Sequence, residues 1–162
     1  MSGAAHRSIW QRRLVDPVVA QLRQGITPDR IALTLALATV LGVFPILGAT
    51  TFLCALAAIW LRLNQPVMQL ANYLLTPLHV ALLLPFYRAG ETLFGQAHVP
   101  IFSVGELLAR FQTDPLQFVV DYGRVALYGI CVWALLAPFA AALLYLTLRP
   151  ALRQLARRVK AA

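Results

Sequence analysis

A run of 31 residues without a charged side chain, Ile31 to Leu61, constrains the fold of this chain more than any other feature of its sequence. A helix of that length would extend about 46 Å at 1.5 Å per residue, whereas the hydrocarbon core of a bilayer is roughly 30 Å thick. Gly42, Pro45 and Gly48 interrupt the run near its middle, and these residue types break helices. The sequence therefore predicts two half-length helices, over about residues 31–43 and 50–61, that meet at a Gly/Pro elbow.

Two further uncharged runs, of 25 and 24 residues, extend from Leu63 to Tyr87 and from Val125 to Leu148. Only 12% of the 162 residues are charged, against about 25% in an average soluble domain. Runs of this length exceed what the cores of soluble proteins use. We therefore expect an all-α integral membrane protein, in which the elbow makes residues 31–61 a re-entrant hairpin.

The placement of charge predicts the topology. Basic residues gather before the first uncharged run and after the last, and the positive-inside rule then places both termini in the cytoplasm. They are Arg7, Arg12, Arg13, Arg23 and Arg30, and then Arg149, Arg153, Arg157, Arg158 and Lys160. Residues 88–124 hold three arginines and four acids, which favours the extracytoplasmic side. Because no apolar block of signal-peptide type precedes residue 31, we expect the first hydrophobic segment itself to direct insertion.

These expectations divide the chain into three parts. The predicted units are a cytoplasmic or interfacial amphipathic segment 1–26, a membrane domain 27–148 and a basic cytoplasmic tail 149–162. The membrane domain consists of hairpin 31–61, span 66–87, extracytoplasmic connector 88–124 and span 125–148. The tail either lies against anionic lipid or forms a disordered solubilising end. An alternative stays open, in which the two early segments dip or cross differently, because Pro77 also interrupts the second run.

Local signals predict where helices start. Residues 8–24 have an amphipathic pattern, and Thr27-Pro28-Asp29 supplies a hydroxyl N-cap, a proline at N1 and an acid at N2. In the connector, Ser103 and Thr113-Asp114-Pro115 begin two further predicted helices, the second running toward Tyr122. We expect flanking helices outside the spans at these places.

Polar residues near the two breaks form the candidate site. Irregular backbone at membrane depth is tolerated only where protein or water satisfies its N–H and C=O groups. Pro77 cannot donate to the carbonyl of Tyr73, and Asn72, Thr76 and His79 are spaced to share one helix face. The predicted functional elbow comprises Gly42, Pro45, Gly48, Thr50, Thr51, Asn72, Thr76, Pro77 and His79, with Arg88 and Glu91 at its mouth.

Residues 10–95 resemble a bacterial membrane family, domain of unknown function 2062. The residues that carry the resemblance are Gly25-Ile-Thr-Pro28-Asp-Arg-Ile-Ala32, Gly42-Val-Phe-Pro45-Ile-Leu-Gly48-Ala-Thr50, Arg62-Leu-Asn64 and Pro85-Phe-Tyr-Arg88-Ala-Gly90-Glu91, followed by Gly95. Many members have Asn-Pro-x-Thr in the second motif, whereas Tyr-Leu-Leu separates Asn72 from Thr76-Pro77 here. The resemblance implies a location in the bacterial cytoplasmic (inner) membrane, and it leaves the activity open.

Two functions fit these patterns. Discontinuous helices expose backbone dipole ends that bind ions or anionic groups in many transporters, so the first is transport, or handling of a small anion or lipid, by a homo-oligomer. The second is a non-transporting scaffold or anchor whose broken helices pack together around a dry elbow. The basic ends predict anionic lipid head groups as partners and give no reason to expect nucleic acid. Motifs for nucleophilic, metal or phosphate chemistry are absent from the sequence, so we expect neither an enzyme nor a cofactor or metal.

Overall fold

The computed structural model describes residues 16, 19–20, 26–97 and 104–161, and within these ranges every regular element is a helix. The amphipathic helix expected over residues 8–24 and the N-cap expected at Ser103 lie largely outside the described residues. The all-α prediction is confirmed for the described part of the chain. Its helices are α2 (Pro28–Gly42), α3 (Ala49–Trp60), α4 (Gln65–Leu74), α5 (Thr76–Leu93), α6 (Val104–Thr113) and α7 (Pro115–Ala161).

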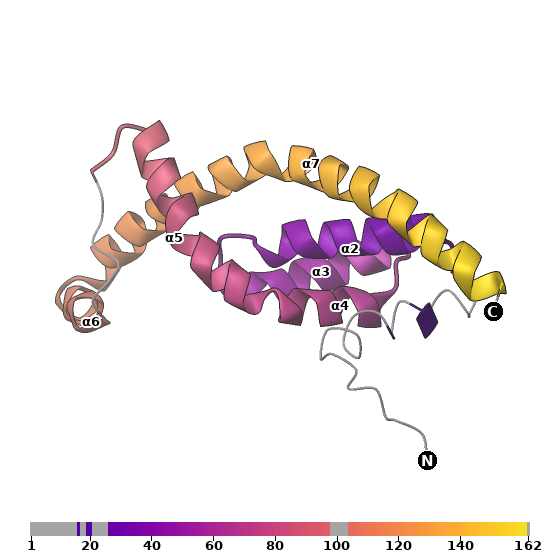
Figure 1. Ribbon diagram of the computed structural model, residues 1–162. Coiled ribbons are helices and arrows are strands. Elements are labelled where there is room, and N and C mark those ends of the chain that lie inside the picture. Colours follow the sequence, from indigo (N-terminus) through magenta and orange to yellow (C-terminus); the bar gives the residue numbers. More distant parts are fainter. Residues whose placement is uncertain (1–15, 17–18, 21–25, 98–103, 162) are drawn as a thin grey trace, which may run out of the picture.

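The uncharged run beginning at Ile31 is broken at the predicted place. Helix α2 starts after the N-cap Thr27, whose side chain accepts a hydrogen bond from the Arg30 N–H, and it ends at Gly42. Helix α3 starts after Gly48, which has a left-handed φ of +85° that glycine adopts without a steric cost. Helix α3 then returns alongside α2 (Figure 1). Both the broken helix and the N-cap prediction are confirmed.

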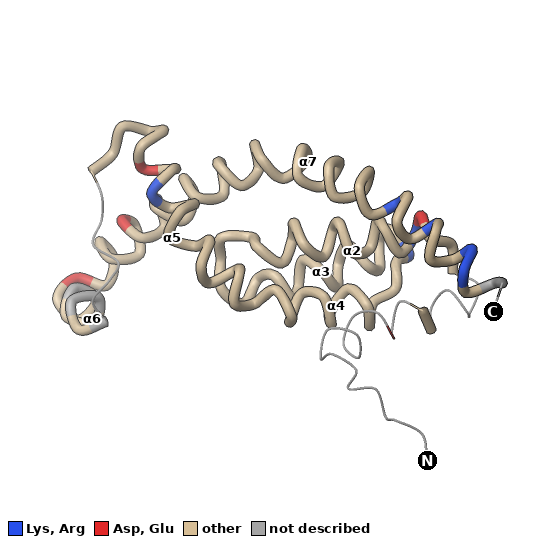
Figure 2. Tube along the Cα trace, in the orientation of Figure 1, with Lys and Arg blue, Asp and Glu red and all other residues tan. Residues whose placement is uncertain are grey.

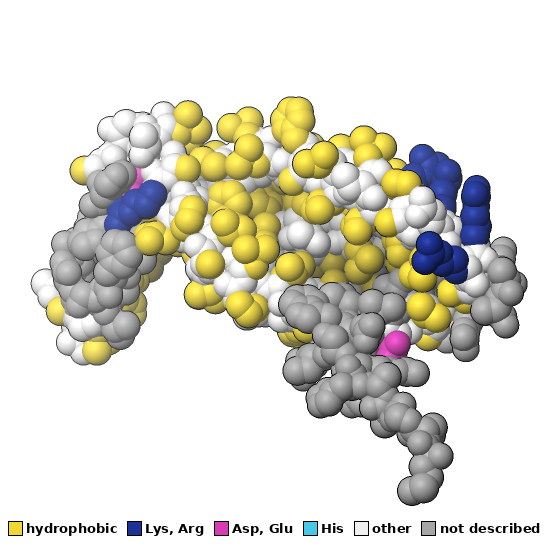
Figure 3. All heavy atoms as spheres, viewed as in Figure 1, with side chains coloured by type: hydrophobic (Ala, Val, Ile, Leu, Met, Phe, Trp, Pro, Cys, Tyr) yellow, Lys and Arg dark blue, Asp and Glu magenta, His cyan; other side chains and the backbone are white. Residues whose placement is uncertain are grey.

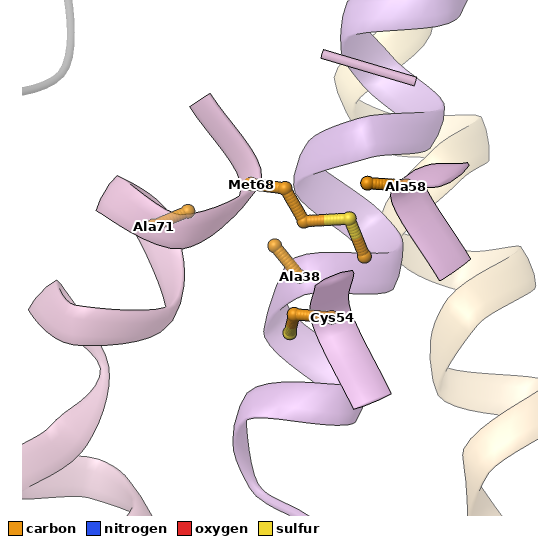
Figure 4. Close-up of a cluster of buried hydrophobic side chains, with 5 residues drawn as sticks. All are labelled: Ala38, Cys54, Ala58, Met68 and Ala71. Carbon is orange, nitrogen blue, oxygen red and sulfur yellow. The ribbon is translucent and has the colours of Figure 1, made fainter. Parts of the chain in front are cut away.

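Helix α4 packs on α2 and α3 and completes a group of three short helices. Small side chains let the three backbones approach closely, and Met68, which is fully buried, fills the space between them. Figure 4 shows this cluster, which consists of Ala38, Cys54, Ala58, Met68 and Ala71.

The second uncharged run is also broken. Helices α4 and α5 meet at Leu75 with a bend of 64°, and Pro77 lies in the first turn of α5. Helix α5 leaves the group of three and crosses α7 (Figure 1). At that crossing Gly90 admits the α7 backbone, because a Cβ on Gly90 would lie 2.6 Å from the backbone carbon of Tyr128.

Helix α7 is a single helix of 47 residues that arches over α2, α3 and α4 in Figure 1. It begins as predicted, since the Asp114 side chain accepts from the Gln117 N–H at 2.9 Å. It does not end near Tyr122, as the sequence had suggested, but continues to Ala161 with Pro138 and Pro150 in its interior. No helix-breaking pair separates residue 122 from the apolar run, so the two join as one helix.

Within the described ranges, α7 is the one single helix long and apolar enough to cross a membrane, and the bent pair α4–α5 passes the same test when taken together. The apolar stretch of α7 is little buried inside the molecule. Hydrophobic side chains cover much of the face seen in Figure 3. In Figure 2 the charged residues gather at the two ends of the molecule, with uncharged residues between them. This distribution indicates membrane association.

Candidate functional site

Two carbonyl groups at the elbow, on Val40 and Pro45, have no backbone partner and receive side-chain donors instead. The Phe44 N–H bonds to the carbonyl of Leu41 rather than to that of Val40, and the indole N–H of Trp133 donates to the Val40 carbonyl at 2.9 Å. The Tyr87 hydroxyl donates to the Pro45 carbonyl at 2.7 Å. Helices α7 and α5 thus supply the hydrogen bonds that the break removes. The irregular backbone at these two carbonyls is therefore satisfied by protein groups rather than by water.

Aromatic packing holds these two donors in place. The rings of Phe44 and Trp133 meet edge to face, 4.9 Å apart between centroids. Gly129 on α7 makes room for Tyr87, because a Cβ there would lie 2.7 Å from the Tyr87 ring and 3.6 Å from the Pro45 side chain. The sequence interpretation did not include Tyr87, Gly129 or Trp133. The signal it could have used is an aromatic ring with a polar tip inside an apolar run, since such tips find a partner when buried.

A second cluster joins the three short helices just beside the elbow. The Asn72 amide donates to the Thr51 hydroxyl at 3.4 Å, and the Gln69 amide donates to the Thr51 carbonyl at 3.0 Å. Gly42 lies against Asn72, whose Oδ1 would be 3.1 Å from a Cβ on that glycine. The structure therefore brings together Gly42, Thr51 and Asn72 as the sequence predicted, and it adds Gln69.

The other predicted residues around Pro77 do not join this cluster as expected. Asn72 is on α4 whereas Thr76 and His79 are on α5, and the 64° bend between these helices removes the single face that the spacing implied. Thr76 and Pro77 are exposed. His79 is buried, and its Nε2 has no hydrogen-bond partner among the described residues.

Thr50, also predicted for the site, is buried on α3, and Gly48 is exposed. Among the described residues no group of three or more His, Cys, Asp or Glu side chains is placed to hold a metal ion.

The predicted mouth residues bind each other. Arg88 Nη1 lies 2.7 Å from Glu91 Oε2, and the Glu91 side chain is completely buried. The guanidinium of Arg88 therefore neutralises a buried carboxylate, which would otherwise be costly to hold out of water. A small hollow of about 90 Å³ opens next to Glu91, between α5 and α7, and its wall includes Gln96, Arg124 and Tyr128.

Arginines of α7 bind the start of α2 at the opposite end of the molecule. Arg153 and Arg149 both reach Asp29, at closest distances of 2.8 and 3.2 Å. Hydrogen bonds from Arg153 and Arg149 lower the pKa of the Asp29 carboxyl from its ordinary 3.8 to about 2. Residues 149–161, expected as a tail, continue α7, and Leu152 and Ala156 pack against Ile31 and Ala32.

A family model matches residues 11–160 of the chain, and the family is described as "Uncharacterized protein conserved in bacteria (DUF2062)". The chain belongs to this family, domain of unknown function 2062, as its sequence motifs suggested. No curated protein and no solved structure matches it.

Proposed function

We propose that this protein is a multi-pass protein of the bacterial cytoplasmic membrane, and that it acts as a non-transporting module, a scaffold or anchor built around a closed, re-entrant hairpin. The observation that carries the proposal is the capping of the Val40 and Pro45 carbonyls by Trp133 and Tyr87. At each of these two carbonyls, a side chain of the same chain supplies the donor that the break removes, so neither carbonyl is left unpaired for an ion.

Helix lengths support the re-entrant geometry. At 1.5 Å per residue, α2 and α3 are about 22 and 18 Å long, both well short of the roughly 30 Å hydrocarbon core. Asp29, Arg30 and Arg62 lie at one end of this pair, and the elbow at the other end carries no charge. A hairpin that enters from the cytoplasm and turns inside the bilayer satisfies both facts. Helix α5 then leads onward to Arg88, and α7 returns.

A second candidate is transport, or handling of a small anion or lipid, by a homo-oligomer. Two buried polar atoms favour it, His79 Nε2 and Gln69 Oε1, which lack hydrogen-bond partners among the described residues. A buried polar atom without a partner costs free energy, so water, a ligand or a second copy of the chain would stabilise the protein there. The paired Arg88 gives no support to an anion site at the predicted mouth.

Cysteine accessibility tests the proposal and separates the two candidates. Single cysteines replace Thr51 or Asn72 at the elbow in a chain lacking Cys54 and Cys131, and intact cells are treated with a membrane-impermeant thiol reagent. We expect both positions to stay unlabelled before and after the cells are permeabilised, because the elbow is dry. Labelling of Thr51→Cys or Asn72→Cys would demonstrate a water-filled cavity and favour transport.

Two exposed positions serve as topology controls. Thr92→Cys should be labelled in intact cells, and Gln154→Cys only after permeabilisation, because the proposed orientation places them on opposite sides of the membrane. The reverse pattern, or equal labelling of both in intact cells, would refute the orientation.

A further inference from the structure

A hollow of about 400 Å³ opens at the end of the three-helix group that lies farthest from the elbow. It sits where α2 begins, where α3 ends and where α4 begins, so three helix termini surround it. Its wall consists of Ile26, Thr27, Arg30, Thr34, Arg62, Leu63 and Asn64. Two arginines therefore share one concave wall with hydroxyl, amide and apolar side chains.

Neither of these arginines forms an ion pair with a described residue, unlike the arginines elsewhere in the structure that bind Glu91 and Asp29. Arg30 Nη1 donates to the backbone carbonyl of Arg62 at 3.3 Å, which holds the Arg30 side chain against the turn that follows α3. Asp29, the acid next in sequence, is already shared by Arg149 and Arg153. The wall of the hollow thus carries two arginines without an acidic partner among the described residues, and an anion bound there would compensate their charge.

The backbone of Arg62 adds a separate observation. Arg62 has a φ of +52°, and among the described residues it is the one non-glycine residue with a positive φ. This conformation costs an ordinary side chain free energy, and glycine or asparagine is the usual occupant. Arg62 is the C′ residue that ends α3, because the Leu63 N–H bonds to the Ala58 carbonyl and the Arg62 N–H bonds to the Ile59 carbonyl. The turn therefore requires a left-handed residue at this position, and Arg62 lines the hollow from it.

The helix starts strengthen the positive potential. Thr27 caps α2 and Asn64 caps α4, so two helices direct their positive dipole ends toward the hollow, against the one negative end of α3. The side chains of Ile26 and Leu63 give the same wall an apolar part. Trp60, just before the turn, is 84% exposed, as expected of an indole at the membrane–water interface.

We propose that this hollow binds a phosphate group at the cytoplasmic surface, with Arg30 and Arg62 as its main ligands. Arginine suits this role because its planar guanidinium donates two parallel hydrogen bonds to phosphate oxygens. The phosphate belongs either to an anionic lipid head group or to a soluble molecule. The cytoplasmic and interfacial placement rests on the orientation given under Proposed function, whereas the site itself rests on the hollow and its two arginines.

Native mass spectrometry of the purified full-length protein in detergent tests the site with phosphatidic acid as the probe and diacylglycerol as the phosphate-free control. The double variant R30Q/R62Q removes both ligands. R157Q/R158Q, on the exposed end of α7 and outside the hollow, removes the same charge. Since a charge-assisted hydrogen bond contributes substantially, we expect R30Q/R62Q to bind phosphatidic acid at least about ten-fold more weakly. R157Q/R158Q removes charge from the basic end that is predicted to lie against anionic lipid, so we expect it to weaken binding by a clearly smaller factor. Equal weakening in both double variants, or no preference of the wild type over diacylglycerol, would overturn the proposal.

Competition with inorganic phosphate identifies the source of the phosphate. Displacement of phosphatidic acid by millimolar phosphate supports the site with a soluble ligand, and resistance to it supports the site with a lipid. Membrane fractionation of the wild type is measured in parallel. A protein found in the soluble fraction would refute the membrane placement alone, whereas a membrane-bound protein whose R30Q/R62Q variant binds like wild type would refute the phosphate site alone.

The variant R62G excludes a purely structural role. Glycine adopts the left-handed conformation without strain, so we expect an unchanged or higher melting temperature together with weakened phosphatidic acid binding. A melting temperature that falls while binding is retained would show that Arg62 serves the turn rather than a ligand, and would overturn the proposal.

Discussion

The two ends of the three-helix group are both held against α7, but by different kinds of interaction. At the elbow, the carbonyls of Val40 and Pro45 lack backbone donors, and the uncharged indole N–H of Trp133 and hydroxyl of Tyr87 donate to them instead. At the opposite end, Asp29 is held by arginines whose side chains are 38% and 49% exposed. Both ends use α7 to close the hairpin, yet the elbow excludes charge and the other end concentrates it.

The difference follows from contact with water, which is greater at the charged end than at the buried elbow. An unpaired backbone carbonyl away from water costs about 1–3 kcal/mol, so a neutral donor at the elbow contributes substantially. An exposed ion pair contributes only about 0–1 kcal/mol, because water and salt screen it. We therefore expect changes at the elbow to affect stability more than changes at the charged end, and the following tests are ordered by that expectation.

The largest effect is expected for Gly129→Ala. Its Cβ would lie 2.7 Å from the Tyr87 ring, so Tyr87 must move and its hydrogen bond to Pro45 weakens. We expect a loss of about 2–3 kcal/mol in the free energy of unfolding. Unfolding of the detergent-solubilised protein, followed by circular dichroism, measures it.

The matched control is Gly123→Ala on the same helix. No atom lies within 4 Å of the Cβ position there, so alanine should be neutral or stabilising. Equal losses for the two variants would contradict the packing described at the elbow.

Removing one elbow donor tests the hydrogen bond itself. Tyr87→Phe retains the ring and leaves the Pro45 carbonyl without its donor, so we expect a loss of about 1–2 kcal/mol by the same unfolding measurement. Tyr73→Phe makes the same chemical change at an exposed tyrosine and should alter stability by less than about 0.5 kcal/mol. Indistinguishable variants would mean that the elbow is hydrated.

At the charged end, the N-cap of α4 should matter less. The Asn64 side chain accepts from the Val67 N–H at 2.9 Å, and Asn64→Ala should cost about 1 kcal/mol. Asn64→Gly should cost only a few tenths of a kcal/mol, since glycine is tolerated at an N-cap. If Asn64→Ala and Asn64→Gly had the same melting temperature, the capping hydrogen bond would not be supported.

The smallest effect is the pH dependence of the Asp29 cluster. The folded-state pKa of Asp29, about 2, lies below its ordinary 3.8, so its stabilisation is present above about pH 4 and is lost as pH falls toward 2. Asp29→Asn should therefore lose less stability than wild type between pH 4 and pH 2, and high salt should shrink the difference. Parallel acid-unfolding curves at low salt would argue against the pairing with Arg149 and Arg153.

The sequence predicted local features better than the contacts that close the site. Thr27-Pro28 and Asp114-Pro115 marked helix starts because capping depends on a few adjacent residues, and Gly42 to Gly48 marked the break for the same reason. The sequence also predicted the interruption near Pro77, but it did not predict the 64° angle between α4 and α5. Because that angle sets which side chains share a face, the expected alignment of Asn72, Thr76 and His79 was wrong.

Long-range partners were harder to predict. Nothing local distinguishes Trp133 or Tyr87 from other aromatic residues in apolar runs, and their roles depend on which helix crosses the elbow. Arg88 and Glu91 were both assigned to the mouth of the elbow, and the ion pair between them was not predicted. Helix spacing of three permits that pair, so this contact could have been predicted.

The closure of the elbow by α7 has a consequence for the order in which the protein is made. The residues that complete the hairpin follow it at a distance, with Trp133 93 residues after Val40 and Arg149 120 residues after Asp29. At a synthesis rate of 5–20 residues per second, roughly 5–25 seconds pass between the appearance of each group and that of its partner. During this interval the nascent hairpin depends on its surroundings, whether translocon, lipid or water, for the bonds that the finished chain supplies. Among α2 to α7, the hairpin is thus the first unit to be synthesised, yet it is completed only when α7 is present.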